Sequence, residues 1–328
     1  MAGDLAPGDD ELARLIAEYH HWLAVERGLA ANSRAAYRRD LRRYEAWLRA
    51  RGVVGLAAVG DNLVHEYVTH LRSRRADDGR PQFAPSSIAR SLVAVRSFHR
   101  FCVQEGEADS DPTELVGAPR VPQGIPKALR EDEIEAVLRA RVECAGDDPL
   151  ACRDQAILEL LYGSGLRISE LVGLDLDALD LDDGMVRVLG KGDKERVVPV
   201  GRSARAALHA YLDRARPRLR GVAVRRRGDS DAVFLNARGG RITRQGCWKL
   251  VREAGARAGL GESLSPHVLR HSCATHMLDH GADIRVVQEL LGHASVSTTQ
   301  VYTKVTPERL RAVYDAAHPR ARAATSTM

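Results

Sequence analysis

Four side chains suited to phosphate chemistry occur within residues 265–303. His267 and Arg270 are three residues apart, so a helix would carry both on one face. His293 follows Gly292, which would end the next helix, and Tyr302 would lie on a short third helix that Ser297 can cap. Imidazoles, a guanidinium and a phenol favour one reaction, the attack of a tyrosine on a phosphodiester. The charge that develops on the phosphoryl oxygens in that reaction needs donors fixed in advance.

A second guanidinium is expected upstream, because one arginine is too little for a phosphoryl transition state. Arg167 fits this role, since it opens a helix directly after the Gly-Ser-Gly turn at 163–165. Backbone N–H groups and a guanidinium at such a turn converge on an anion. A surface salt bridge would also explain Arg167. Glu170, one helical turn later, is interpreted as a buried partner that orients Arg167 rather than as a catalyst.

Lysine is rare in this chain, which is rich in arginine, yet Lys191 and Lys194 both stand in one predicted hairpin loop. Residues 185–189 and 195–200 are predicted to form its two strands. Arginine would hold a phosphate as well as lysine, but it gives up a proton far less readily, with a pKa above about 12 against about 10.4. Lys191 is therefore interpreted as a proton donor, whereas Lys194 is explained by a solvated turn.

The elements that must position these groups fall into two parts, of which the first is a predicted helical bundle. Apolar residues recur at helical spacing over 11–26, 32–51, 62–73 and 85–105. Two of these helices carry a basic outer face, which favours contacts with DNA phosphates over a merely solvated surface. The arginines interpreted in this way are Arg34, Arg38, Arg42, Arg96 and Arg100.

Residues 117–127 hold three prolines and two glycines without a helical period, which predicts an extended linker. It would join a DNA-binding domain, 1–116, to a catalytic domain, 128–328. The predicted fold class is therefore mainly α with two domains, the second also carrying the small antiparallel hairpin. Further helices are predicted over 154–162, 203–215, 265–280 and 283–291, with a short strand over 233–235.

A helix that starts near Thr243 has two arginines at its entrance, Arg241 and Arg244, interpreted as further contacts with the DNA backbone. Trp248 on the same helix is predicted to belong to the core. Thr306 caps and Pro307 begins a last helix with an apolar stripe, predicted to be a docking helix.

The composition of the chain limits its possible partners and its location in the cell. The net charge of +5 and pI of about 9.1 give a mild bias toward polyanions. The five cysteines are scattered and lack metal-ligand spacing, as in reduced cytosolic proteins. No signal peptide or long apolar span is evident, so we expect a cytoplasmic, nucleoid-associated protein that does not contact membranes.

Together these motifs resemble the tyrosine recombinase (phage integrase) family over nearly the whole chain. The stretches that carry the resemblance are EYHHWLAVERGLAANSRAAYRRDL, GSGLRISEL, GKGDKERVVPVG, HVLRHSCATHML and LGHASVSTTQVYT. The tail VYDAAHPRARA is more similar to the XerC branch of the family than to its partner branch, XerD. Lys304 and Cys273 depart from the common pattern, but neither is one of the central residues.

The resemblance implies a SAM-like core-binding domain and a catalytic set of Arg167, Lys191, His267, Arg270, His293 and Tyr302. Tyr302 would form a 3′-phosphotyrosyl link, while the two arginines and His293 stabilise the transition state and Lys191 protonates the leaving 5′-oxygen. His267 would act either as a base or as a phosphate ligand, and the sequence leaves both open. No metal or cofactor is implied, because guanidinium groups take over the stabilisation of charge.

The resemblance also implies partners. The substrate would be double-stranded DNA with two half-sites, at a chromosomal terminus site where chromosome dimers are resolved. A second, XerD-like recombinase would complete a heterotetramer in which the last helix docks on a neighbouring subunit, and a DNA translocase would be a further partner. Docking of that helix on its own domain is the alternative.

Other functions would also be consistent with parts of the sequence. A phage or plasmid integrase of the same family, or a type IB topoisomerase, would use similar chemistry. A metal-dependent nuclease would need the acidic run Asp175, Asp177, Asp180, Asp182 and Asp183 as ligands. Leucines alternate with these aspartates, and this pattern favours a solvated edge with an apolar inner face instead of a metal-binding carboxylate cluster. A protein that only binds DNA would not need Tyr302.

Overall fold

The computed structural model describes residues 11–53, 55–117, 128–142, 148–190, 195–222, 231–261, 263–292 and 306–321. The chain forms two compact units, Met1–Gln123 (unit 1) and Gly124–Met328 (unit 2), each with its own hydrophobic core. Apart from Gly117, the predicted linker lies outside the described residues, so it stays a prediction.

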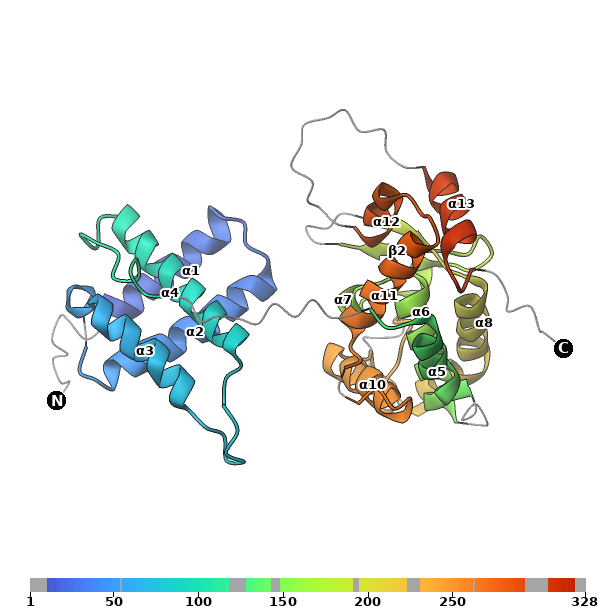
Figure 1. Ribbon diagram of the computed structural model, residues 1–328, viewed down its shortest axis with the longest axis horizontal. Coiled ribbons are helices and arrows are strands. Elements are labelled where there is room, and N and C mark those ends of the chain that lie inside the picture. Colours follow the sequence, from blue (N-terminus) through green and yellow to red (C-terminus); the bar gives the residue numbers. More distant parts are fainter. Residues whose placement is uncertain are drawn as a thin grey trace. The chain divides into compact units, whose positions relative to one another are not determined.

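Unit 1 is a bundle of four helices (Figure 1). They are α1 (Glu11–Val25), α2 (Ala31–Arg49), α3 (Asp61–Ser73) and α4 (Pro85–Gln104), with a short 3-10 turn at Leu56–Ala58. All four correspond to predicted helices. Each buries an apolar stripe, and aromatic rings such as Tyr19 and Phe98 fill the centre of the bundle.

The core of unit 1 also holds polar groups, and two of them connect α2 to α4. Asp40 is 1% exposed and accepts hydrogen bonds from Arg43 Nη1 at 3.1 Å and Arg90 Nε at 3.0 Å. Tyr44 Oη lies 3.0 Å from His99 Nε2. Burial of a polar group is costly unless it is hydrogen-bonded, so these pairs fix how α2 and α4 meet.

Unit 2 packs helices around a central α6 (Figure 1). Its helices are α5 (Glu131–Val142), α6 (Pro149–Gly163), α7 (Ile168–Val172), α8 (Arg202–Ala210), α9 (Arg216–Val222), α10 (Arg244–Arg257), α11 (Pro266–Asp279), α12 (Ile284–Leu291) and α13 (Pro307–Ala317). Together with unit 1 they confirm the mainly α fold class.

The small sheet of unit 2 has the strand order β1-β2-β3, with β1 (Leu179–Asp180), β2 (Met185–Leu189) and β3 (Glu195–Pro199). Both pairings are antiparallel, and the β2–β3 register runs from Met185 opposite Pro199 to Leu189 opposite Glu195. The predicted hairpin is therefore confirmed, and β1 adds an edge strand that the sequence did not predict.

Three predicted elements of unit 2 differ from the structure. The strand predicted over 233–235 is wrong, because within this segment only Leu235 forms a bridge, to Arg241. A second isolated bridge, between Asp175 and Ala232, lies just before the segment. The helix predicted to start at 154 begins at Pro149, because Asp148 accepts a hydrogen bond from the Leu150 N–H at 2.9 Å and caps it. The helix predicted to end at 215 continues through a π turn, Tyr211–Ala215, into α9.

The C-terminal helix α13 packs on its own unit, against β3, α11 and α12. Leu310 and Tyr314 are buried there, and the Tyr314 ring stacks on His318 with centroids 4.7 Å apart. In this single chain the docking helix is therefore placed in cis. Within the described residues, no helix is both long and apolar enough to cross a membrane.

Candidate active site

Arg167 is positioned by the turn that joins α6 to α7. Gly165 has a φ of +58°, and a Cβ there would lie 2.8 Å from Leu291 Cδ2, so the turn requires glycine. Arg167 then caps α7, and its N–H donates to Glu170 Oε2 at 2.8 Å. Its Nη1 donates to Glu170 Oε1 at 2.7 Å, which fixes the guanidinium while leaving the side chain 37% exposed.

Arg270 reaches the same place from α11. Ser265 Oγ accepts a hydrogen bond from the Val268 N–H at 3.3 Å and so caps this helix. Arg270 is 6% exposed, and its Nη1 and Nη2 donate to the carbonyl oxygens of Gly165 and Leu291. Burial, followed by the charge of Arg167, lowers the pKa of Arg270 to about 10, so it stays protonated near neutral pH.

The C-terminal end of α12 binds three arginine side chains of the site. Three successive carbonyl oxygens there accept hydrogen bonds from three different arginines: Leu290 from Arg196, Leu291 from Arg270 and Gly292 from Arg167. The last carbonyls of a helix lack partners inside it and carry partial negative charge, so guanidinium groups stabilise them. The end of α12 thereby holds the two predicted catalytic arginines side by side, immediately before His293.

Glu170 links these arginines. Its side chain is 2% exposed, and it accepts hydrogen bonds from both Arg167 and Arg196. Burial by itself would raise the pKa of Glu170, but the hydrogen bonds from Arg196 and Arg167 outweigh burial and lower the pKa. Glu170 is therefore a carboxylate near neutral pH. Its predicted place as a buried partner of Arg167 agrees with this geometry.

The other predicted catalytic residues divide into one that is described and three that are not. His267 lies on the exposed side of α11, one turn before Arg270. Lys191, His293 and Tyr302 lie outside the described residues. Their roles in catalysis therefore stay predictions.

Arg196 is the residue of this site that sequence reasoning missed. It lies on β3, where alternation places it on the same face as the buried Val198. A charged residue on the inner face of a strand was the available signal. Gly292, with φ +64°, leaves room for the Arg196 side chain, because a Cβ there would approach its Nε to 3.1 Å.

The predicted DNA-contact arginines of unit 1 lie on its surface. Arg38 and Arg42 are exposed on α2, and Arg34 is half-buried. On α4, Arg96 Nη2 donates to the Val116 carbonyl, and Arg100 is 68% exposed with Nε 3.6 Å from Asp111.

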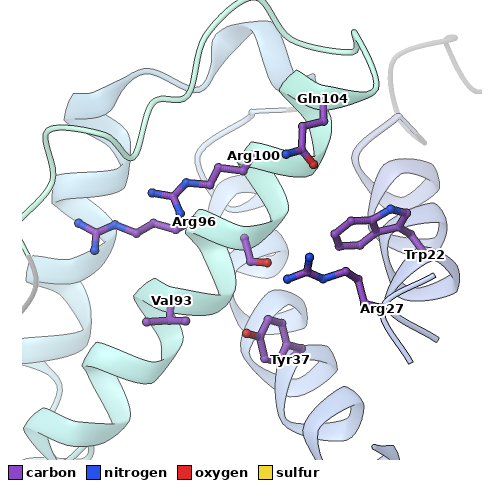
Figure 2. Close-up of a pocket in the computed structure, with 8 residues that line it drawn as sticks. Trp22, Arg27, Tyr37, Val93, Arg96, Arg100 and Gln104 are labelled. Carbon is purple, nitrogen blue, oxygen red and sulfur yellow. The ribbon is translucent and has the colours of Figure 1, made fainter. Parts of the chain in front are cut away.

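A pocket of about 440 Å³ adjoins this part of α4 (Figure 2). It is lined by Trp22, Arg27, Tyr37, Val93, Arg96, Ser97, Arg100 and Gln104. Aromatic and cationic side chains share its wall without a carboxylate among the lining residues. Such a surface suits a polyanion that carries apolar sugar groups.

Two further predictions concern α10 and the residues before it, and one of them is wrong. Arg241 uses its terminal nitrogens within unit 2, donating to the carbonyl oxygens of Val172 and Leu174 and to Asp175. This pairing gives Arg241 a structural role in the chain without DNA, and its predicted DNA contact stays a prediction. Trp248 is 44% exposed and lies under Arg252, so its predicted place in the core is wrong. Arg244 is exposed at the start of α10, as its prediction requires.

Members of the acidic run have partners within the chain. Asp175 pairs with Arg241, and Asp180 accepts a hydrogen bond from the Asp183 N–H at 2.9 Å. Among the residues that the structure describes, no group of three or more His, Cys, Asp or Glu side chains is placed to hold a metal ion.

Comparison with known proteins decides the family. Residues 127–309 match the phage integrase family, and residues 16–106 match its N-terminal SAM-like domain. Tyrosine recombinase XerD of Mycobacterium tuberculosis is 51% identical over 312 residues, which cover 95% of this chain and 99% of that protein. This chain belongs to the phage integrase family of tyrosine recombinases. It is accordingly an enzyme that breaks and rejoins DNA in site-specific recombination.

The branch within the family differs from the one predicted. Tyrosine recombinase XerD of Halalkalibacterium halodurans is also similar to this recombinase, at 43% identity over 304 residues, 93% of this chain and 97% of that protein. The tail predicted a XerC-like chain, whereas these relatives are named XerD. Eleven residues of tail carry much less information than identity over the whole chain, so the XerC assignment is withdrawn.

Solved structures show the same fold at low identity. The XerH site-specific recombinase bound to its difH substrate gives a TM-score of 0.64 at 19% identity, covering 94% of this chain and 97% of that one. A lambda integrase dimer bound to a core site gives a TM-score of 0.60 at 16% identity, covering 90% and 99%. These likenesses describe architecture alone.

Proposed function

We propose that this recombinase resolves chromosome dimers at a chromosomal terminus site, together with a second recombinase of the complementary branch. The observation that carries the catalytic part is the pair of guanidinium groups, Arg167 and Arg270, anchored on the last carbonyls of α12. The identity to XerD relatives over almost the full chain supports the biological role. Because those relatives are named XerD, the partner becomes XerC-like instead of the XerD-like protein that the tail predicted.

In the proposed reaction, Tyr302 Oη attacks the scissile phosphorus and the bond from phosphorus to the 5′-oxygen breaks. The phenol proton passes to a base, and the 5′-oxygen takes a proton from Lys191. Arg167, Arg270 and His293 hold the phosphoryl oxygens as negative charge builds. His267, exposed one turn before Arg270, is open to either of its two predicted roles, base or phosphate ligand. Rejoining reverses these steps with a new 5′-hydroxyl.

DNA binding is proposed to use both units. The exposed Arg38 and Arg42 on α2, with Arg34 beside them, would contact phosphates without reading sequence. Arg96 and Arg100 would do the same beside the pocket of Figure 2, where a deoxyribose fits the wall of Trp22, Tyr37 and Val93. In unit 2, Arg241 and Arg244 would contact the DNA backbone beside the start of α10.

The proposed assembly is a heterotetramer on DNA with two half-sites, formed at the nucleoid and controlled by a DNA translocase. Since α13 packs on its own unit in a single chain, assembly would exchange this contact for one on a neighbour. Ending the chain after Val305 is then expected to spare binding to a single site and weaken cooperative assembly. Normal assembly and recombination by the truncated chain would contradict the exchange.

The test is covalent trapping. The full chain is incubated with nicked DNA that carries a candidate terminus site, with and without the second recombinase, and protein–DNA adducts are measured. We expect an adduct that forms in the presence of EDTA and disappears in Tyr302→Phe, while DNA binding by this variant is retained.

Three outcomes would change the proposal. An adduct that survives Tyr302→Phe would place the nucleophile elsewhere. Trapping on attachment sites of mobile elements, but not on terminus sites, would indicate a phage or plasmid integrase. Relaxation of supercoiled DNA without any site preference would indicate a topoisomerase.

A further inference from the structure

Arg196 lies at the centre of the site but has no part in the chemistry described above. Its Nη1 and Nη2 donate to the two carboxylate oxygens of Glu170, at 2.7 and 2.9 Å, and its Nε donates to the Leu290 carbonyl at 3.1 Å. The side chain is 12% exposed. Two parallel hydrogen bonds between a guanidinium and a carboxylate form the strongest geometry available to this pair, so Arg196 is rigidly held.

The charge balance of the site depends on Arg196. Glu170 orients Arg167, but a carboxylate paired with Arg167 alone would cancel the positive charge that a phosphate needs. With Arg196 present, two guanidinium groups share one buried carboxylate and one positive charge remains. Arg270 supplies a second. Within the described residues, these three arginines meet no carboxylate other than Glu170.

We propose that Arg196 is a positioning residue that neutralises Glu170 and thereby keeps the charge of Arg167 available to the scissile phosphate. This inference rests on the proposed function of the site. A phosphodiester carries one negative charge, and further negative charge builds on its oxygens as the nucleophile adds. Two uncompensated guanidinium charges in a partly buried site match that change, whereas one would not.

The contact between Arg196 and Glu170 allows Arg167 to be oriented by a carboxylate without losing its net positive charge. Glu170 fixes Arg167 through the backbone N–H and Nη1, so it cannot be replaced by an apolar residue without loosening Arg167. Arg196 removes the electrostatic cost of that carboxylate. Because Arg196 also binds the Leu290 carbonyl, the same side chain ties β3 to the helix end that precedes His293.

The test compares Arg196→Ala with the double variant E170Q/R196A. Adduct formation is followed in single turnovers on nicked DNA at saturating protein, which removes any effect on affinity. We expect Arg196→Ala to slow the reaction by on the order of tenfold to a hundredfold, which is less than the roughly 10²–10³-fold cost of losing a donor that touches the reacting oxygens. The double variant should recover much of this loss, because removal of the carboxylate charge restores two uncompensated arginines.

A role as scaffold alone predicts the opposite order, since losing both partners would loosen Arg167 further. A double variant no faster than Arg196→Ala would therefore overturn the proposal. Should Arg196→Ala fail to fold in thermal unfolding, Arg196→Gln replaces it in the same pair of measurements.

A second substrate provides an independent readout. A methylphosphonate at the scissile position is neutral. Loss of one positive charge from the site should therefore slow its cleavage less than it slows cleavage of a phosphodiester. The defect of Arg196→Ala, relative to wild type, should fall to within a few-fold on this DNA, and an undiminished defect would count against the charge argument. The matched control is Arg187→Ala on β2, because the Arg187 side chain is 49% exposed. This variant should cleave both substrates like wild type.

Different results would refute the proposed function and the proposed role of Arg196. Absence of any adduct with the wild-type chain would refute the proposed function. A wild-type adduct, combined with a double variant that gains nothing over Arg196→Ala, would refute only the role of Arg196.

Discussion

Unit 1 and unit 2 use arginine in opposite surroundings. In unit 1, Arg38 and Arg42 stand in solvent on the outside of a helix. In unit 2, Arg270 is 6% exposed and donates to two backbone carbonyls. The first arrangement gives a mobile, salt-screened charge that suits contacts with any duplex. The second gives a charge that is already oriented and desolvated, as stabilisation of a transition state requires. Residue type alone does not separate these roles; burial and hydrogen-bond partners do.

The largest expected effect is that of Arg270→Ala. Loss of one preorganised donor should reduce single-turnover cleavage by roughly 10²–10³-fold. It should also lower the free energy of unfolding by about 1–3 kcal/mol, because the Gly165 and Leu291 carbonyls lose their partner. Adduct formation and urea unfolding measure the two effects. Arg38→Ala is the control from unit 1, and a cleavage defect as large as that of Arg270→Ala in this variant would break the comparison between the units.

Lys191→Arg should have the next largest effect. Arginine retains the positive charge but gives up its proton far less readily, so DNA binding should be normal and cleavage slower by roughly 100-fold. A substrate with sulfur in place of the bridging 5′-oxygen needs no proton donor. On this substrate the Lys191→Arg defect should largely vanish, while that of Arg167→Ala should persist. Equal defects of Lys191→Arg on both substrates would reassign Lys191 to phosphate positioning.

A smaller, salt-dependent effect is expected from unit 1. Arg38→Ala combined with Arg42→Ala should reduce the slope of log binding constant against log salt by about two, with equal losses on specific and random DNA. Cleavage at saturating protein should not change. Arg130→Ala combined with Arg139→Ala, both more than 70% exposed in unit 2, is the matched control. A loss restricted to the specific site would show that unit 1 reads bases.

The smallest expected effect concerns acid stability. Burial lowers the pKa of His99 in unit 1 to about 4, and that of His318 in unit 2 to about 3. Both histidines are neutral when folded, whereas the unfolded chain binds a proton below about pH 6.5. Stability is therefore complete above pH 6.5 and falls as the pH drops toward the folded values.

Each histidine should cost about 1 kcal/mol at a pH one unit below 6.5. Urea unfolding at two pH values checks this, with His99→Gln and His318→Gln as variants in the respective units. Each variant should show a smaller pH dependence than wild type. An unchanged pH dependence in both would mean that other groups titrate.

Much of the fold was predictable because most of its helices are defined by local sequence signals. The helices of unit 1 follow from apolar spacing, and α11 from Ser265-Pro266 at its start. Errors arose where a distant partner decides the outcome. The segment 233–235 has strand-forming residues but finds only single bridges, and Trp248 lies just outside the buried stripe of Cys247, Leu250 and Val251 on α10.

By itself, the sequence determined the types and order of the chemical groups and the helices that carry them, since helical period, caps and glycine turns are local. It singled out Arg167, with Glu170 as its partner, and Arg270, without showing which carbonyl groups hold them. Only the tertiary structure decided that their guanidinium groups meet at the last carbonyls of α12 and share that place with Arg196. The reason is physical: a buried carbonyl or carboxylate must find a donor, and here the donors come from a helix cap, a strand and a second helix that lie far apart along the chain.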